Sequence, residues 1–368
     1  MPFRTIAMAP GDSRIRHSYT GVVGAQARRS RDGTLPDPQG ATSARTTPAQ
    51  MKPGTRHAGK ERASMDTPHD SIIRPNRLLL ATDGSEDAVL AARVATDLSL
   101  RTGARLHVAH AWYHLVKGLT YPTLVWADYS DLYEREARKI LETQVDAIEA
   151  ADCAVAQSHL LHGPPIDAIL DLCEELRPGL VIVGSRGLGP VRRMFVGSVS
   201  EGVVHHARCP VLVVRGGEEA WPPARIVAGD DGSKSAELAA ELAGGIGAVC
   251  GAEGVLVRAY RTPPRPIGGW SAEDRRKLEE ARSKEEENLD ERAETLGVVM
   301  GRRSGTRLVD ADATLALLQV AEEGEERKSL LAVGSRGLGA VDRARLGSVS
   351  TNVLRAARGP VLIYSSGP

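Results

Sequence analysis

Short apolar runs alternate with amphipathic segments from about residue 77 onward. Leu78–Thr82 is a compact apolar run followed by Asp83-Gly84-Ser85, and it predicts a buried strand that turns into a helix. Apolar residues at helical spacing predict the helices, and short apolar or alternating runs predict the strands. The expected strands are 78–82, 106–112, 155–161, 180–183 and 209–214, and the expected helices are 85–101, 131–150, 166–176 and 198–207.

The same pattern begins again after residues 216–223, a polar stretch with a proline pair that we interpret as a linker. Strands are expected at 225–229, 254–260, 330–333 and 360–364, with helices after Ser233 and over 273–296. Asp83 and Asp231 are 148 positions apart, so the repeat is a domain duplication. Strands alternating with helices predict an α/β fold with a parallel sheet, helices on both faces, and a ligand site at the carboxyl ends of the strands.

A glycine-rich loop follows the fourth strand of each repeat. The spacing is Gly184-x2-Gly187-x9-Gly197-Ser198 in the first repeat, and Gly334, Gly337 and Gly347-Ser348 reproduce it in the second. Glycine backbone next to a helix N-terminus suits a phosphate, because bare N–H groups can approach it and the helix end is electropositive. Glycines that only form tight turns are the alternative.

Ser198 has two interpretations. Its hydroxyl can donate to a phosphate, or its side chain can cap the following helix, with Glu201 completing a capping box. The second repeat has Thr351 in place of Glu201. No Gly-Lys-Ser/Thr follows the glycines, and the loop follows a late strand, so neither a Walker loop nor the dinucleotide fingerprint fits.

Composition narrows the class of protein. The chain has 368 residues and only two Phe, so its cores must be aliphatic. Its formal net charge is zero, which disfavours a nucleic acid or a membrane as the main partner of the whole chain. The four cysteines are scattered, which is typical of packing residues in a reducing cytosol. We therefore expect a cytoplasmic protein.

Residues 1–71 differ from the rest, with eleven Lys and Arg, six Asp and Glu, and little apolar periodicity. Such a segment buries too little surface to offset its ordering entropy, so we expect disorder. A transit peptide or a nucleic-acid-binding tail also fits this composition. A third hypothesis is that translation starts at Met65, which N-terminal mass spectrometry would test through the presence or absence of peptides from residues 1–60.

The motifs resemble those of the universal stress protein family. The resemblance rests on Thr82-Asp83-Gly84-Ser85, on Gly163-x-Pro165 and on the two glycine loops, and it covers roughly 75–215 and 224–366. It implies two tandem domains, 72–215 and 224–366, each an open five-stranded parallel sheet of the adenine nucleotide α-hydrolase type with strand order 3-2-1-4-5. It also implies pairing through the last strands, either between the two halves of one chain or in a homodimer.

The resemblance implies ATP as the ligand. A Mg²⁺ ion held mainly through the phosphates would fit oxygen ligands. The resemblance places Asp83 and Asp231 at the ribose, and Ala111 and Ala259 near adenine. The alternative for Asp83 is that it only caps the following helix, which Ser85 could also do. The first phosphate loop would comprise Gly184, Arg186, Gly187, Gly197, Ser198, Val199 and Ser200. The second would comprise Gly334, Arg336, Gly337, Gly347, Ser348, Val349 and Ser350. The arginines of the loops are either phosphate ligands or solvated surface residues: Arg186, Arg192 and Arg193 in the first loop, and Arg336, Arg343 and Arg345 in the second.

The second repeat departs from the pattern in two places. It lacks the Gly-x-Pro turn, and Asp230 stands where the first repeat has Thr82. A carboxylate near the site would repel phosphate unless a metal ion or an arginine offsets it, so ATP binding is less secure there.

The resemblance therefore implies an ATP-binding stress or dormancy regulator that is not a conventional enzyme. The alternatives are a slow ATPase or self-phosphorylating enzyme, with Ser198, Ser200, Ser348 and Ser350 as acceptor candidates, and an interaction scaffold without nucleotide. No His, Cys, Asp and Glu spacing predicts a metal site.

Overall fold

A computed structural model describes residues 75–113, 123–187, 196–323, 328–337 and 346–365. The N-terminal segment 1–71 lies outside the described residues, so the expectations for it stay predictions. The described residues form two repeats with the same order of strands and helices.

The first repeat alternates strand and helix throughout. Its strands are β1 (Arg77–Ala81), β2 (Arg105–Trp112), β3 (Val155–His162), β4 (Leu180–Gly184) and β5 (Val211–Val214). Its helices are α2 (Glu86–Thr102), α3 (Thr123–Glu149), α4 (Pro165–Leu176) and α5 (Ser198–His206).

A short 3₁₀ turn, η1 (Glu218–Ala220), leads to the second repeat. The strands of that repeat are β6 (Arg225–Gly229), β7 (Glu253–Tyr260), β8 (Gly305–Asp310), β9 (Ser329–Gly334) and β10 (Val361–Tyr364). The helices are α6 (Lys234–Cys250), α7 (Ala272–Met300), α8 (Ala313–Glu322) and α9 (Ser348–Ala356).

The ten strands form one sheet in the order β3-β2-β1-β4-β5-β10-β9-β6-β7-β8. Each half therefore has the expected order 3-2-1-4-5, and its strands are parallel. The two halves meet where β5 and β10 pair antiparallel, with Leu212 opposite Leu362. The other strands of each half keep the register of a doubly wound sheet, which places the carboxyl ends of β1 and β4 side by side.

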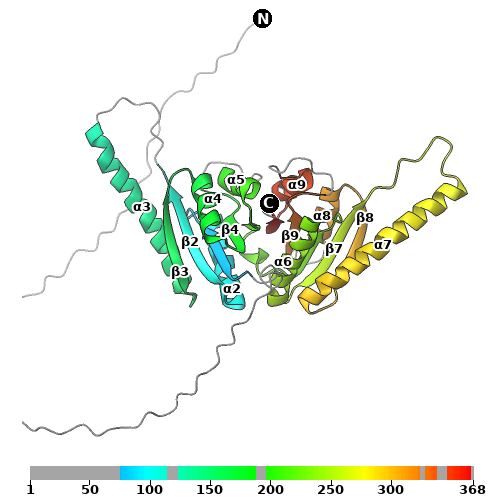
Figure 1. Cartoon of the computed structure of the whole chain (residues 1–368), viewed down its shortest axis with the longest axis horizontal. Coiled ribbons are helices and arrows are strands. Elements are labelled where there is room, and N and C mark those ends of the chain that lie inside the picture. The colour runs from blue at the N-terminus through cyan, green and yellow to red at the C-terminus, as the bar shows by residue number, and fades with distance from the viewer. Residues whose placement is uncertain (1–74, 114–122, 188–195, 324–327, 338–345, 366–368) are drawn as a thin grey trace, which may run out of the picture. The chain divides into compact units, whose positions relative to one another are not determined.

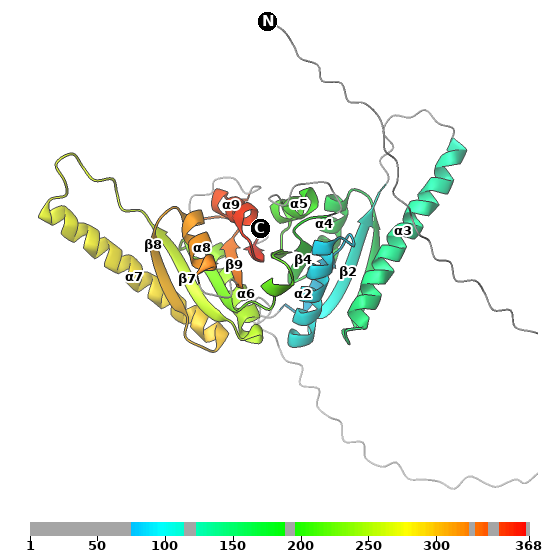
Figure 2. The same ribbon diagram turned by 180° about the vertical axis from the view of Figure 1, so that it is seen from behind.

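Two apolar layers pack on the sheet. Residues of β1 alternate between them: Leu78 and Leu80 face α2 and α3, whereas Leu79 and Ala81 face α4 and α5. Figure 1 shows α4, α5, α8 and α9 on one side of the sheet and α2 and α6 on the other. In the view from behind, α3 and α7 flank the outer strands (Figure 2). Among the described residues, the largest fully buried side chains are all Leu or Ile, as the composition predicts.

Helix starts follow the sequence signals closely. Ser85 is the N-cap of α2 and Ser233 that of α6, and each hydroxyl accepts a hydrogen bond from the backbone three residues on. Helix α3 begins at Thr123, eight residues before the expected start. Figure 1 shows the first turns of α3 beyond the ends of β2 and β3.

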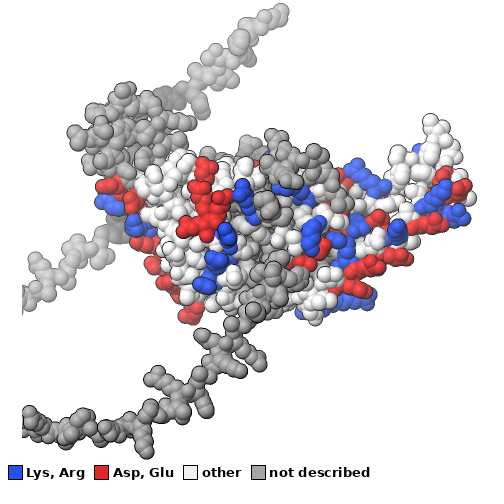
Figure 3. Space-filling view, in the orientation of Figure 1, with Lys and Arg blue, Asp and Glu red and all other residues white. Residues whose placement is uncertain are grey.

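Helix α7 also runs past its expected end, to Met300. Figure 3 shows basic and acidic side chains interspersed along it, as expected of a solvated face. Glu285 is an exception, because its carboxylate contacts Arg258 of β7 at 2.5 Å. In the described part of the chain, none of the helices is both long and apolar enough to cross a membrane.

Candidate functional site

A cavity of about 260 Å³ opens at the carboxyl ends of β1 and β4. All nine site residues predicted for the first repeat line it: Asp83, Ala111, Gly184, Arg186, Gly187, Gly197, Ser198, Val199 and Ser200. The fold thus brings together residues that are more than 100 positions apart in the sequence.

The second repeat has a matching cavity of about 360 Å³. All nine residues predicted there line it: Asp231, Ala259, Gly334, Arg336, Gly337, Gly347, Ser348, Val349 and Ser350. The arginines at 192, 193, 343 and 345 lie outside the described residues. Ligand binding by any of these residues stays a prediction.

Sequence reasoning missed one wall of each cavity. Pro165 and Ile169 of α4 line the first cavity, and Ala313 and Leu317 of α8 line the second. Pro165 was recognised only as part of a turn motif. Helix α8 lacks that turn and starts instead with Asp312, whose carboxylate caps the backbone of Thr314. Although the second repeat lacks the Gly-x-Pro turn, α8 still forms a wall of the second cavity.

Two of the loop glycines are explained by close packing. A Cβ on Gly184 would lie 2.7 Å from the carbonyl carbon of Asp87, in the first turn of α2. A Cβ on Gly187 would overlap the Asp83 carboxylate. A Cβ on Gly334 would lie 2.7 Å from the carbonyl carbon of Ser235, and a Cβ on Gly337 would overlap the Asp231 carboxylate. Only glycine lets the loop approach the first strand and its helix this closely.

The helix after each loop starts without a side-chain cap. Gly197 is the N-cap of α5, Ser198 is exposed, and no cap hydrogen bond from a side chain forms. The capping box with Glu201 is absent, because Gly197 and not Ser198 is the N-cap, and Glu201 forms an ion pair with Arg355 of α9 at 2.5 Å. The α5 N-terminus therefore presents backbone N–H groups and the Ser198 hydroxyl at the cavity.

Ser200 has a structural bond of its own. Its hydroxyl donates to the Gly184 carbonyl at 2.6 Å, and Ser350 donates to the Gly334 carbonyl at the same distance. These bonds hold the helix against the end of the fourth strand. Ser198 and Ser348 are thus better placed than Ser200 and Ser350 to meet a ligand with their hydroxyls.

The Asp83 carboxylate holds a turn of the backbone and borders the cavity. Its Oδ1 accepts from the backbone N–H of Ser85 at 3.0 Å, which fixes the turn into α2. Its Oδ2 lies directly against Gly187 at the border of the cavity. Asp231 accepts from Ser233 at 2.9 Å and faces Gly337 in the same way.

Arg186 is engaged by a carboxylate. Its Nε and Nη2 donate to Asp87 at 2.9 and 2.8 Å, and the Ser185 hydroxyl donates to the same carboxylate at 2.5 Å. Burial alone would raise the pKa of Asp87, but the hydrogen bonds from Arg186 and Ser185 and the nearby positive charges lower it below 3.8. The second repeat has Ser235 in place of Asp87, and its hydroxyl donates to the Arg336 carbonyl at 2.5 Å. The two predicted phosphate arginines thus have different surroundings.

The carboxylate of Asp230 is neutralised within the protein. Arg258 Nε donates to it at 3.0 Å and Arg292 Nε at 2.7 Å, and the Asp230 side chain is 2% exposed. Leu256 and Arg258 are two residues apart on β7 and therefore lie on the same face of the sheet, the one covered by α7. Leu317, which lines the cavity, packs on the opposite face, the one covered by α8. Asp230 also borders the second cavity, and Arg258 and Arg292 supply the arginine charge that offsets it, so binding of a phosphate there stays a prediction.

The same three positions in the first repeat are uncharged or weakly basic. Thr82, His110 and Gln144 stand where Asp230, Arg258 and Arg292 stand in the second. Thr82 donates to Gln144 at 3.3 Å, and His110 Nδ1 contacts the Thr82 carbonyl at 2.7 Å. Each repeat thus stabilises the end of its first strand with a different set of three partners.

Among the described residues, no group of three His, Cys, Asp or Glu side chains could hold a metal ion. A divalent cation at these cavities would have to be held largely by ligand oxygens, such as those of a polyphosphate.

Comparison with known proteins identifies the repeats. The model of the universal stress protein family matches residues 75–215 and 223–365. A universal stress protein of Mycobacterium tuberculosis (strain H37Rv) is 28% identical over 302 residues, which is 78% of this chain and 96% of that protein. A shorter one from Thermus aquaticus is 36% identical over 138 residues, covering 38% of this chain and 97% of its own length.

A solved structure has the same fold. The crystal structure of a universal stress protein from Archaeoglobus fulgidus aligns with a TM-score of 0.56 at 24% identity, covering 79% of this chain and 97% of that one. With both halves matched, the fold and the sequence agree: this chain belongs to the universal stress protein family and carries two of its domains in tandem.

Proposed function

We propose that both cavities bind ATP and that the chain acts as a nucleotide-dependent stress or dormancy regulator in the cytoplasm. The observation that carries the proposal is the repetition of one arrangement. In each repeat, a carboxylate, a glycine loop and an uncapped helix N-terminus with an exposed serine border one cavity. Family membership supports a stress-related role.

The cavity offers suitable residues for the ribose, the base and the phosphates of a nucleotide. Asp83 Oδ2 can accept from ribose hydroxyls, and the apolar wall of Ile169 and Val183 can cover a flat base. The N-terminus of α5 suits the phosphates, because its N–H groups and dipole favour negative charge. Mg²⁺ would be held through phosphate oxygens.

The concentration of nucleotide can then change the stability of the folded protein. Ligand at 100 times its Kd stabilises the fold by about 2.7 kcal/mol, which is enough to bias a conformation or a choice of partner. We also propose that β5 and β10 pair in solution as they do in the structure. The two halves of one chain would then make the same strand pairing that two separate domains would make in a homodimer.

The test uses Ser198 and Ser348, which are exposed first residues of helices. A glutamate there suits the helix dipole but repels phosphate. ATP titrated by calorimetry into the full chain should bind at two sites, whereas Ser198→Glu and Ser348→Glu should each remove one. Ser198→Gln and Ser348→Gln are the uncharged controls and should retain both.

No heat of binding in the wild-type chain, and no nucleotide released from the purified protein, would exclude the proposal in favour of an interaction scaffold. The slow ATPase is tested separately by timed ADP release. Release no faster than that of the Ser198→Glu/Ser348→Glu double variant would exclude it.

A further inference from the structure

A second type of cavity lies at the opposite end of the strands. It measures about 380 Å³ and is bordered by the first residues of β6, β7 and β8. Four arginines line it together with two carboxylates: Arg225, Arg302, Arg303, Arg307, Glu253 and Glu323. We call it the arginine groove. It shares no lining residue with either glycine-loop cavity.

Three of these guanidinium groups are positioned by backbone carbonyls. Arg225 Nη1 donates to the Glu323 carbonyl, Arg302 Nη1 to the Gly251 carbonyl and Arg307 Nη1 to the Thr306 carbonyl, each at 3.0 Å. A carbonyl orients a guanidinium without cancelling its charge, and each guanidinium keeps further N–H donors for a ligand.

The carboxylates offset only part of this charge. Arg307 and Glu323 approach to 3.9 Å, and their side chains are 56% and 41% exposed, so this pair contributes little. Counting the described lining residues, four positive charges face two negative ones. The groove therefore keeps a local positive potential, although the chain as a whole has a net charge of zero.

We propose that the arginine groove binds a small compound carrying two or more phosphate charges, independently of the nucleotide cavities. Arginine forks match phosphate oxygens in bidentate geometry, and several forks around one concavity favour a ligand with several such oxygens. The zero net charge disfavours a long polyanion, which gains affinity from an extended basic surface.

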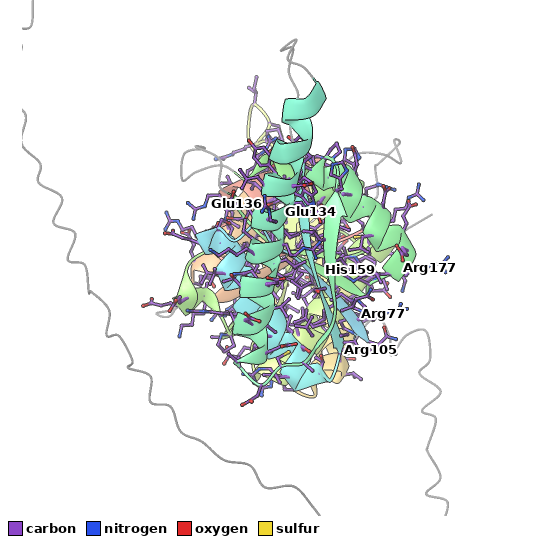
Figure 4. All side chains as sticks on the ribbon, turned by 90° about the vertical axis from the view of Figure 1, so that its left-hand side faces the viewer. Arg77, Arg105, Glu134, Glu136, His159 and Arg177 are labelled. Atoms are coloured by element: carbon purple, nitrogen blue, oxygen red, sulfur yellow. The ribbon has the colours of Figure 1, made fainter. Side chains whose placement is uncertain are left out.

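The first repeat offers an internal comparison. Figure 4 labels Arg77, Arg105, Arg177 and His159 on the corresponding side of that repeat. Arg77 corresponds to Arg225, but His159 takes the place of Arg307.

The histidine at this place is not a second cation. His159 Nε2 contacts His107 Nδ1 at 3.2 Å, and burial is the main cause that lowers the pKa of both rings. A lowered pKa leaves the imidazoles neutral at pH 7. At this one position, Arg307 therefore gives the second repeat a fixed charge, whereas the first repeat has Arg105 at the position of Glu253.

The experiment measures inorganic pyrophosphate by calorimetry on the full chain carrying Ser198→Glu and Ser348→Glu, so that the glycine loops do not contribute. Pyrophosphate should still bind, and Arg302→Gln/Arg303→Gln should weaken it about tenfold or more, as expected for lost charge-assisted hydrogen bonds. Arg307→His, the residue of the first repeat, should weaken it measurably. Arg276→Gln, an exposed change on α7, is the matched control and should have no effect.

Equal pyrophosphate affinity in the Arg302→Gln/Arg303→Gln variant and the control would overturn the proposal. Binding of a poly-glutamate peptide without binding of pyrophosphate would also overturn the proposal. Unchanged thermal unfolding of the variants confirms that the fold is intact. The result is separate from the ATP proposal, which is tested on the wild-type chain and the serine variants.

Discussion

Gly187 lies against Asp83 so closely that a Cβ at residue 187 would overlap the aspartate Oδ2. Gly337 and Asp231 repeat this relation in the second half. The contact joins the carboxyl ends of the first and fourth strands. It also means that a side chain at residue 187 acts first on Asp83, whether or not a ligand is present.

We expect Gly187→Ala to destabilise the first half by about 1–3 kcal/mol, because a methyl group is forced into a packed contact. The cost should be smaller in an Asp83→Ala background, where the overlapping carboxylate is gone. A double-mutant cycle of urea unfolding measures this coupling. Additive costs would show that the two residues do not interact.

The Asp230 cluster predicts a second non-additive result. Asp230→Thr leaves Arg258 and Arg292 without their buried carboxylate and should cost about 3–5 kcal/mol. The triple change Asp230→Thr, Arg258→His and Arg292→Gln installs the set of the first repeat and should cost less than the single change. A triple variant less stable than Asp230→Thr would contradict the prediction that the set acts as a unit.

Asp87 predicts a pH dependence of stability. Its pKa in the folded protein is lowered below 3.8, so its stabilising contribution is complete above that value and is lost as pH falls through the folded-state pKa. Thermal unfolding at pH 7 and at pH values below 4 should show a smaller acid-induced drop in Asp87→Asn than in the wild type. Asp146→Asn, an exposed change on α3, should keep the wild-type drop.

Arg215 predicts how strongly the halves are joined. It follows β5, is 8% exposed, and its Nη1 donates to the Leu354 carbonyl of α9 at 2.6 Å. Arg215→Met should remove a charge-assisted bond and cost about 1.5–3 kcal/mol, measured by urea unfolding. Arg93→Met, on the exposed face of α2, is the control. Equal effects of the two changes would mean that the Arg215 bond does not stabilise the pairing.

The cavities could largely be predicted from sequence because their parts are local motifs. A glycine loop after a strand and an aspartate after the first strand mark the same edge of any doubly wound sheet. The wall residues Ile169 and Leu317 were missed because an apolar residue on an amphipathic helix looks the same whether it covers a core or a cavity. The capping role considered for Ser198 was wrong because Gly197 takes the cap position, and spacing alone does not separate the two.

Sequence by itself determined the duplication, the parallel sheet and the positions of both loops, because apolar periodicity and glycine spacing are properties of neighbouring residues. Only the tertiary structure decided which charged side chains pair with one another. Asp230 turns to the α7 side and is neutralised by Arg258 and Arg292, and Arg186 is held by Asp87. These partners are 28 to 99 positions apart, so only the packing of the helices on the sheet brings them together.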